Sequence, residues 1–196
     1  MVQQIQQPGP LVWINAFAGV GKLTIARELV KLMGGSEKVI LIDNHTLIDV
    51  VKLTRDHADY QPQRREARQA CFDRFVICDA SSSAQDRGKT IVFTDFQSSN
   101  ELGGSVAREY EDAARRAGRR FVPVYLECGK EETVRRATLP ERSVEGKGKL
   151  VDGAVLRGFL DTMRLFEFEG VEGLRLDVTA RSPAEVAAEL AGLIGS

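Results

Sequence analysis

A glycine-rich stretch between an apolar run and an amphipathic segment constrains the fold of this chain more than any other feature. Residues 15–24 read Asn-Ala-Phe-Ala-Gly-Val-Gly-Lys-Leu-Thr, after the apolar run 11–14 and before the patterned segment 25–33. This order predicts a buried strand, a glycine loop and a helix. Glycines allow successive backbone N–H groups to point inward, and the start of the following helix adds partial positive charge. We therefore expect this loop to bind an anion of triphosphate size.

The loop approximates the P-loop pattern G-x-x-x-x-G-K-[ST] with two departures. Ala16 replaces the first glycine, and Leu23 replaces the hydroxyl residue that usually helps to hold Mg²⁺. We expect Thr24, one residue further on, to supply that hydroxyl. A dinucleotide-binding loop is disfavoured because its third glycine is missing, and a plain glycine turn with an exposed lysine is the remaining alternative. The residues expected to bind the phosphates are Ala18, Gly19, Val20, Gly21, Lys22, Leu23 and Thr24.

Composition and charge indicate a small-molecule partner. The 196 residues, with a net charge of −1, suit a single domain spanning 1–196 and show no basic excess for nucleic acid or an anionic membrane. The N-terminal residues lack the pattern of a signal peptide, and no stretch is long and apolar enough for a membrane span. The three cysteines are too widely spaced for a disulfide framework or a zinc site. We expect a cytoplasmic protein, as a monomer or homodimer.

The apolar runs predict an α/β fold with five parallel strands. Segments with helical patterning separate the runs, and local signals place a helix end at Gly34, a helix from about Ser105 to Gly118 and a capping box at Ser182. Two segments do not fit simple alternation, and we expect a substrate-side insert at about 43–88 and a lid at about 130–152. The predicted strands contain residues 11–14, 39–42, 90–93, 121–126 and 174–176.

Two carboxylates follow predicted strands and are candidates for the chemistry. Asp95 closes the third strand beside the loop, and we expect it to hold Mg²⁺ together with Thr24, with a turn cap as the alternative. Asp43 closes the second strand and is the candidate base or orienting group for an acceptor hydroxyl. A helix N-cap is an equally weighted interpretation of Asp43.

Arginines after the fourth strand are candidates for stabilising transferred charge. Arg136 and Arg142 lie on the predicted lid, and we expect both to stabilise charge that develops during phosphoryl transfer. For Arg135 we favour a surface pair with Glu131, four residues earlier. A second group lies in the substrate-side insert and could line a substrate cleft, although we favour a charged helix surface. Its members are Arg64, Arg65, Arg68 and Arg74.

Together these motifs resemble the small P-loop kinases of nucleoside-monophosphate-kinase fold, and among them the chloramphenicol-phosphotransferase-like and tunicamycin-resistance-type proteins. The resemblance covers nearly the whole chain and is carried by Trp13-Ile14-Asn15 before the Gly19–Lys22 loop, by Asp43, and by Cys128-Gly129-Lys130-Glu131-Glu132 followed by Arg136. It implies a three-layer α/β/α sandwich with sheet order 2-3-1-4-5, ATP with Mg²⁺ as cofactors, and a lid that closes over the phosphates.

These features predict an ATP-dependent phosphotransferase that moves the γ-phosphoryl group to a small-molecule acceptor. Lys22, Asp43, Arg136 and Arg142 are the expected catalytic residues, with Thr24 and Asp95 at the metal. Two alternatives stay open: an ATP-binding regulator or degenerate kinase without transfer activity, and a nucleic-acid end kinase.

Overall fold

The computed structural model describes residues 7–77, 84–139 and 152–195. Its centre is a five-stranded sheet in the order β2-β3-β1-β4-β5 in which neighbouring strands pair in parallel, so the expected fold and strand order are confirmed. Each strand is slightly longer than its apolar run, because a polar residue continues the strand at its carboxyl end. The strands are β1 Leu11–Asn15, β2 Val39–Asp43, β3 Thr90–Asp95, β4 Phe121–Glu127 and β5 Leu174–Asp177.

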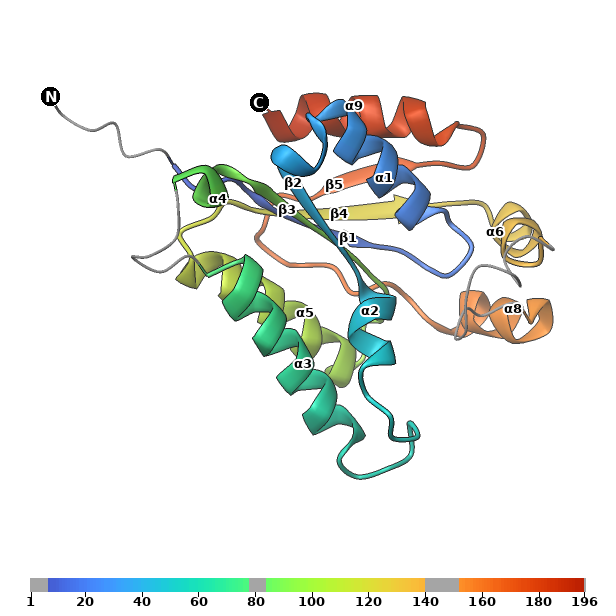
Figure 1. Ribbon diagram of the computed structural model, residues 1–196. Coiled ribbons are helices and arrows are strands. Elements are labelled where there is room, and N and C mark those ends of the chain that lie inside the picture. The colour runs from blue at the N-terminus through green and yellow to red at the C-terminus, as the bar shows by residue number, and fades with distance from the viewer. Residues whose placement is uncertain (1–6, 78–83, 140–151, 196) are drawn as a thin grey trace, which may run out of the picture.

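Helices cover both faces of this sheet (Figure 1). On one face, α1 (Lys22–Leu32) and α9 (Pro183–Gly195) pack against each other and over Val12 and Ile14. On the other, α3 (Tyr60–Phe75) and α5 (Glu101–Arg116) cover Leu11 and Trp13. Successive residues of β1 thus point into different cores, as strand geometry requires.

Two of the predicted helix signals are confirmed and one helix start is wrong. Gly34 follows α1 with φ 99°, and Ser182 and Glu185 exchange capping hydrogen bonds at the start of α9. The helix expected from about Ser105 begins at Glu101, where the Asn100 side chain accepts a hydrogen bond from the backbone N–H of Gly103 at 2.7 Å. A Cβ on Gly103 would lie 2.1 Å from the Ser98 carbonyl oxygen, so this glycine permits close packing inside the helix.

The described part of the substrate-side insert contains three helices, of which α3 contributes Cys71 and Phe72 to the core. The other two are α2 (Asn44–Asp49), directly after β2, and α4 (Ala84–Gly88), before β3. A single turn of 3-10 helix, Gly35–Glu37, joins α1 to β2.

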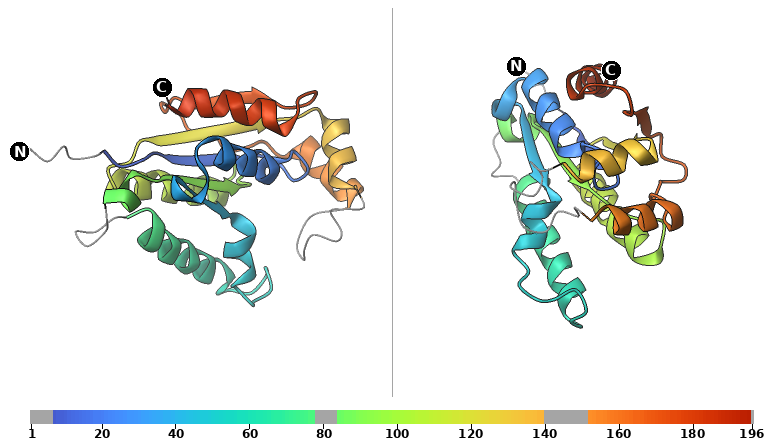
Figure 2. Two further views of the ribbon diagram at one scale, coloured as in Figure 1. Left: turned by 45° about the horizontal axis from the view of Figure 1, so that its top comes forward. Right: turned by 90° about the vertical axis from the view of Figure 1, so that its right-hand side faces the viewer.

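Two helices in the C-terminal half stand at the carboxyl edge of the sheet. They are α6 (Lys130–Ala137) and α8 (Gly153–Thr162), which lie side by side (Figure 2) and share a small apolar cluster of Val134, Ala137 and Leu156. Ala18 of the glycine loop packs against this cluster. Arg142 lies outside the described residues.

Candidate active site

The glycine loop has the backbone conformation that its sequence predicts. Gly19 and Gly21 have φ angles of 90° and 98°, in the left-handed region that disfavours other residues. A Cβ on Gly19 would lie 2.4 Å from the carbonyl oxygen of Thr133, so this glycine also lets the loop contact α6. A Cβ on Gly21 would meet nothing within 4 Å, so its backbone angle, and not packing, requires a glycine there.

Lys22 is the first residue of α1 and folds back over the loop. Its Nζ donates to the carbonyl oxygens of Ala16 and Phe17, at 3.1 and 3.3 Å. These contacts hold the cation beside the backbone curve between β1 and α1. A helix start, a glycine loop and a fixed ammonium group together form an anion-binding arrangement.

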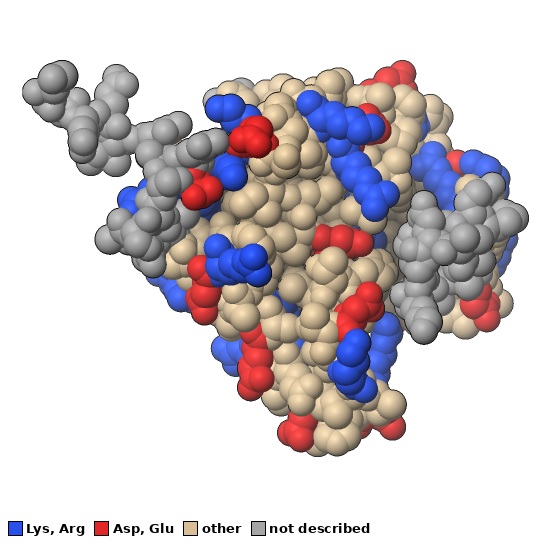
Figure 3. Space-filling view, viewed as in Figure 1, with Lys and Arg blue, Asp and Glu red and all other residues tan. Residues whose placement is uncertain are grey.

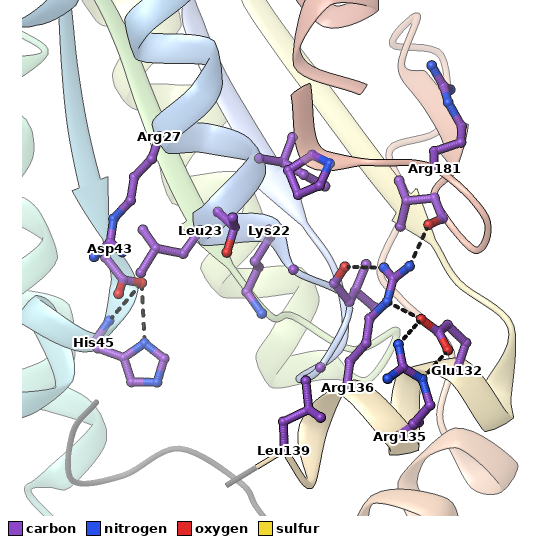
Figure 4. Close-up of a pocket in the computed structure, with 17 residues that line it drawn as sticks. Lys22, Leu23, Arg27, Asp43, His45, Glu132, Arg135, Arg136, Leu139 and Arg181 are labelled. Atoms are coloured by element: carbon purple, nitrogen blue, oxygen red, sulfur yellow. Dashed lines mark hydrogen bonds and ion pairs between the residues drawn. The ribbon is translucent and has the colours of Figure 1, made fainter. Parts of the chain in front are cut away.

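A cavity of about 380 Å³ opens over the loop, and we call it the loop pocket. Five of the residues that line it are basic and two are acidic, which favours an anionic ligand. Figure 4 shows Asp43 and His45 on one side of it, the residues of α6 on the other, and Lys22 between them. The basic lining residues are Lys22, Arg27, Arg135, Arg136 and Arg181, and the acidic ones are Asp43 and Glu132.

Arg136 links three parts of the loop pocket. Its guanidinium donates to the carbonyl oxygens of Val20 at 3.3 Å, Val178 at 3.1 Å and Thr179 at 2.8 Å, and to the Glu132 carboxylate at 2.6 Å. The side chain therefore ties α6 to the glycine loop and to the segment after β5 (Figure 4). These bonds give it a structural task, and its catalytic role stays a prediction.

The pairing expected for Arg135 is wrong. Arg135 forms a two-bond ion pair with Glu132, at 2.7 and 2.8 Å. Glu131 instead pairs with Arg157 of α8 at 2.6 Å, and thereby links α6 to α8. The two arginines on Glu132 lower the pKa of that carboxyl to about 2.

Asp43 caps a helix and also lines the loop pocket. Its Oδ1 accepts hydrogen bonds from the His45 backbone N–H at 3.4 Å, the His45 ring at 3.2 Å and the Thr94 hydroxyl at 2.9 Å. Burial alone would raise the pKa of Asp43, but the hydrogen bonds from His45 and Thr94 outweigh burial and hold the pKa below its usual value. The cap interpretation is confirmed, and the carboxylate is ionised at neutral pH.

The structure does not bring Thr24 and Asp95 together. Thr24 is exposed and lines the loop pocket, whereas Asp95 is fully buried and lines neither of the two cavities described here. The Asp95 carboxylate accepts from Asn44 Nδ2 at 2.5 Å, from Phe96 N at 2.8 Å and from Gln97 Nε2 at 2.9 Å. Both oxygens are thus occupied, and Asp95 does not fit the expected role of a magnesium ligand.

Among the described residues, no group of three or more His, Cys, Asp or Glu side chains is placed to hold a metal ion. Thr24 lines the loop pocket, and its role at a metal ion stays a prediction.

A second cavity of about 520 Å³, the Arg64 pocket, adjoins the loop pocket. Three residues line both cavities: Lys22, Asp43 and His45. Aromatic and apolar side chains supply much of the remaining wall, and the Phe17 and Phe96 rings lie against each other, tilted by 40°, with centroids 5.0 Å apart. The wall also contains Ile48, Tyr60, Leu102, Val106, Leu156 and Phe159, with the polar residues Asn44, Arg55, Gln61, Arg64, Arg68 and Gln97.

The expectation of a charged helix surface is wrong for two of the four arginines of the insert. Arg64 and Arg68 are 7% and 3% exposed and line the second cavity, whereas Arg65 and Arg74 are exposed. A sequence signal for this burial exists, because Tyr60, Arg64, Arg68 and Phe72 recur every four residues on one face of α3. The aromatic wall carries no comparable signal, since it joins residues far apart in the chain.

On the face shown in Figure 3, basic and acidic side chains of the described residues are interspersed and form no continuous basic stripe. Within the described ranges, no helix combines the length and the apolar character needed to cross a membrane.

No protein-family model and no curated protein sequence matches this chain. Solved structures match its fold over almost the whole length. The APS kinase of Mycobacterium tuberculosis, in complex with AMPPNP and APS, is 18% identical, with a TM-score of 0.61 over 97% of this chain and 99% of that one. The tunicamycin resistance protein of Deinococcus radiodurans is 16% identical, with a TM-score of 0.55 over 95% and 96%. The fold is that of the P-loop small-molecule kinases.

A third similar structure shares this fold. Kti12 of Chaetomium thermophilum, in complex with ADP-AlF3, is 16% identical, with a TM-score of 0.59 over 95% of this chain and 100% of that one. At these identities the likeness establishes the fold, and the activity of this chain has to be argued from its own residues.

Proposed function

We propose that this chain transfers the γ-phosphoryl group of ATP to a hydroxyl or phosphate group of a small-molecule acceptor. The observation that carries the proposal is the junction of two cavities at Lys22, Asp43 and His45. One cavity contains the phosphate-type loop, and the other is large enough for a small organic molecule. Two ligands bound there would meet where a cation and an ionised carboxylate stand.

The nucleotide would occupy the loop pocket. Backbone groups of residues 18–24 and the start of α1 would hold the phosphates, and Lys22 would leave its loop carbonyls to contact them. The similar kinase structures solved with AMPPNP and with ADP-AlF3 support a nucleotide in this fold. Mg²⁺ bound with ATP would neutralise phosphate charge, and the Thr24 hydroxyl is the described group that fits beside it.

Asp43 would orient the acceptor. Phosphoryl transfer depends mainly on positioning and on charge stabilisation, so a carboxylate with a low pKa can serve by accepting a hydrogen bond from the attacking hydroxyl. Its Oδ1 is fixed by His45 and Thr94, and this fixes the direction of the carboxylate group. Arg136, on the opposite wall, would stabilise the transferred charge if its bonds to backbone carbonyls rearrange when the lid closes; Arg142 is proposed for the same task.

The decisive experiment is a screen for acceptor-dependent ADP release, with Lys22→Ala as the test variant. Metabolites, nucleosides, antibiotics and a 5′-hydroxyl oligonucleotide would be offered with ATP and Mg²⁺. We expect Lys22→Ala to lower turnover by about 10³-fold, near the upper end of what is lost with one charge-stabilising donor. Lys31→Ala is the matched control, because Lys31 lies on the same helix and its side chain is 69% exposed.

The outcomes separate the candidate functions. Wild-type ATP affinity and wild-type turnover in Lys22→Ala would refute the loop assignment. ATP binding that depends on Lys22, without ADP release on any acceptor, would instead support a nucleotide-binding regulator. Turnover confined to the oligonucleotide would support an end kinase.

A further inference from the structure

Arg64 is a buried cation that forms no ion pair with a carboxylate of the described residues. The residue is 7% exposed, and its Nη2 and Nη1 donate to Asn44 Oδ1 at 2.9 Å and to the Tyr60 hydroxyl at 3.5 Å. Its Nε is buried and has no hydrogen-bond partner within the described part of the chain. There is also no acidic side chain among the described residues in an ion pair with it. Burying a charged arginine without an ion pair lowers the stability of the fold, so packing alone does not explain why an arginine stands here.

Arg68, one helical turn after Arg64, is a buried arginine of the same helix that is paired within the protein. It is 3% exposed, and its Nε and Nη2 donate to the two carboxylate oxygens of Glu109 at 2.8 and 3.1 Å. This is the two-bond geometry that suits a guanidinium group. The two arginines differ in one respect: among the described residues, Arg68 forms an ion pair with a carboxylate and Arg64 does not.

Neighbouring residues hold Arg64 in place from one side. Asn44 accepts from Arg64 through Oδ1 and donates through Nδ2 to the buried carboxylate of Asp95, at 2.5 Å. Asp95 therefore fixes the orientation of the amide, and the amide oxygen fixes the guanidinium. This leaves the unpartnered Nε on a side chain that lines the Arg64 pocket.

The residues around Arg64 favour a ligand that has an apolar part as well as a charge. Phe17, Phe96, Tyr60 and Phe159 contribute rings, while Asp43 is the one acidic residue that lines the cavity among those described. Asp43 stands at the junction with the loop pocket. The cavity thus combines an apolar wall, a cation with no ion pair to any described carboxylate, and a carboxylate at the junction.

We propose that the acceptor is an amphipathic anion, with an apolar or aromatic body and an oxyanion group that pairs with Arg64. The oxyanion would be a carboxylate, a phosphate or a sulfate, which share the ability to accept two parallel hydrogen bonds from a guanidinium. The acceptor's hydroxyl would point toward Lys22 and Asp43. The term acceptor rests on the proposed function, whereas the anion site rests on Arg64 alone.

Calorimetry with small aromatic probes tests the site without turnover. The nucleotide-free protein would be titrated with benzoate, phenyl phosphate and phenyl sulfate, and with the uncharged benzamide and phenol. We expect at least one anion to bind about 10-fold or more tightly than the neutral probes, because hydrogen bonds between charged partners are the strong ones. The order of affinity among the three anions shows whether the site prefers a planar carboxylate or a tetrahedral phosphate or sulfate.

Variants of α3 assign that preference to Arg64. We expect Arg64→Gln to remove the preference and Arg64→Lys to keep part of it. Arg74→Gln is the matched control, since Arg74 is an exposed arginine on the same helix and lines neither described cavity. Repeating the titrations with saturating AMPPNP separates the sites, because anions bound at the glycine loop are displaced and anions bound at Arg64 are not.

Three results would overturn the proposal: equal affinity for benzoate and benzamide with no preference for any anion, an unchanged preference in Arg64→Gln, or complete displacement of the anions by AMPPNP. If Arg64→Gln does not fold, the wild-type comparison and Arg64→Lys decide. Arg64-dependent anion binding by a protein that binds no AMPPNP would keep the anion site and refute the phosphotransferase proposal.

Discussion

The two cavities that meet at Lys22 are built in different ways. The loop pocket contains one contiguous stretch of lining residues, 19–25, whose glycines have positive φ angles, and later segments complete its wall. The Arg64 pocket is assembled from side chains of segments as distant as Phe17 and Phe159. A site formed by backbone conformation can be recognised from a short sequence motif, because glycine positions and a lysine specify it. A site made of side chains exists once the tertiary structure has formed.

The two cavities also tolerate change differently. Around the glycine loop, the positive φ angles of Gly19 and Gly21 are the main requirement. Around Arg64, a chain of hydrogen bonds runs from Asp95 through Asn44 to the guanidinium, and every link is buried or half-buried. Partly satisfied buried networks of this kind are costly to disturb. We therefore expect substitutions on the loop side to change activity first, and substitutions on the Arg64 side to change stability as well.

The largest effect in this comparison is expected where the two cavities meet. Asp43→Asn should lower turnover by about 10²-fold, within the range for a positioned group that assists proton transfer. ATP affinity should stay close to wild type, because the change concerns the acceptor and asparagine is also a good N-cap. Steady-state kinetics with an identified acceptor, together with ATP titration, measure both quantities.

Asp49→Asn is the control for this variant, since it removes one charge at the far end of the same helix, outside both described cavities. Wild-type turnover in Asp43→Asn would mean that this residue serves as a helix cap alone. The base or orienting group would then have to be sought elsewhere.

The extent to which the sequence predicts this molecule follows the same division. The five strands, their parallel pairing and the glycine loop could be predicted because each depends on local pattern. Hydrophobic patterning misses the two buried arginines because it assigns arginine to the surface, although they share a helix face with two aromatic residues. Their partners could not be predicted, since the counter-ion Glu109 is 41 residues from Arg68.

Asp95 illustrates the limit most clearly. Its position in the sequence, at the end of a strand beside the loop, is typical of a metal ligand. Its actual partners, Asn44 and Gln97, come from the segments that follow β2 and β3. Strand pairing and the path of these two connections decide what the carboxylate contacts, and neither is contained in the residues around it.

The second prediction assigns Asp95 to the hydrogen-bond chain that supports Arg64, and Thr24 to the loop pocket. Asp95→Asn should lower the free energy of unfolding by about 1–3 kcal/mol, because buried donors lose their charged acceptor. Its Mg²⁺ requirement should remain that of wild type. Thr24→Ala should do the reverse, raising the Mg²⁺ requirement at almost unchanged stability, since Thr24 is exposed.

Urea unfolding and metal titration of turnover check both variants. A raised Mg²⁺ requirement in Asp95→Asn at unchanged stability would return Asp95 to the metal site. It would also remove the assignment of Asp95 as the support of Asn44 and Arg64.

The third prediction concerns Arg136, which ties the loop pocket together. Arg136→Ala should lower the free energy of unfolding by about 1 kcal/mol, since bonds to Val20, Val178 and Thr179 are lost. Arg135→Ala, with an exposed ion pair to the same glutamate, should cost less. A kcat that falls in Arg136→Ala much more than in Arg135→Ala, at equal ATP affinity, would add the catalytic role that the sequence predicts.

The smallest predicted effect is the pH dependence of stability contributed by Asp43. Its pKa is lower in the folded protein than the ordinary value of 3.8, because hydrogen bonds from His45 and Thr94 outweigh burial. The ionised carboxylate therefore stabilises the fold at pH values above that ordinary pKa, and the contribution disappears as pH falls through the lower folded pKa.

The difference in unfolding free energy between wild type and Asp43→Asn should be constant from pH 7 to about 5 and should shrink below about 4. Other carboxylates titrate in the same range, but they do so in both proteins and cancel in the difference. Thr94→Val removes one of the hydrogen bonds, so in that background the contribution should be smaller and its loss should be complete at a higher pH. A difference that stays flat to the lowest pH, or that grows as pH falls, would show that the Asp43 charge does not stabilise the junction between the two cavities.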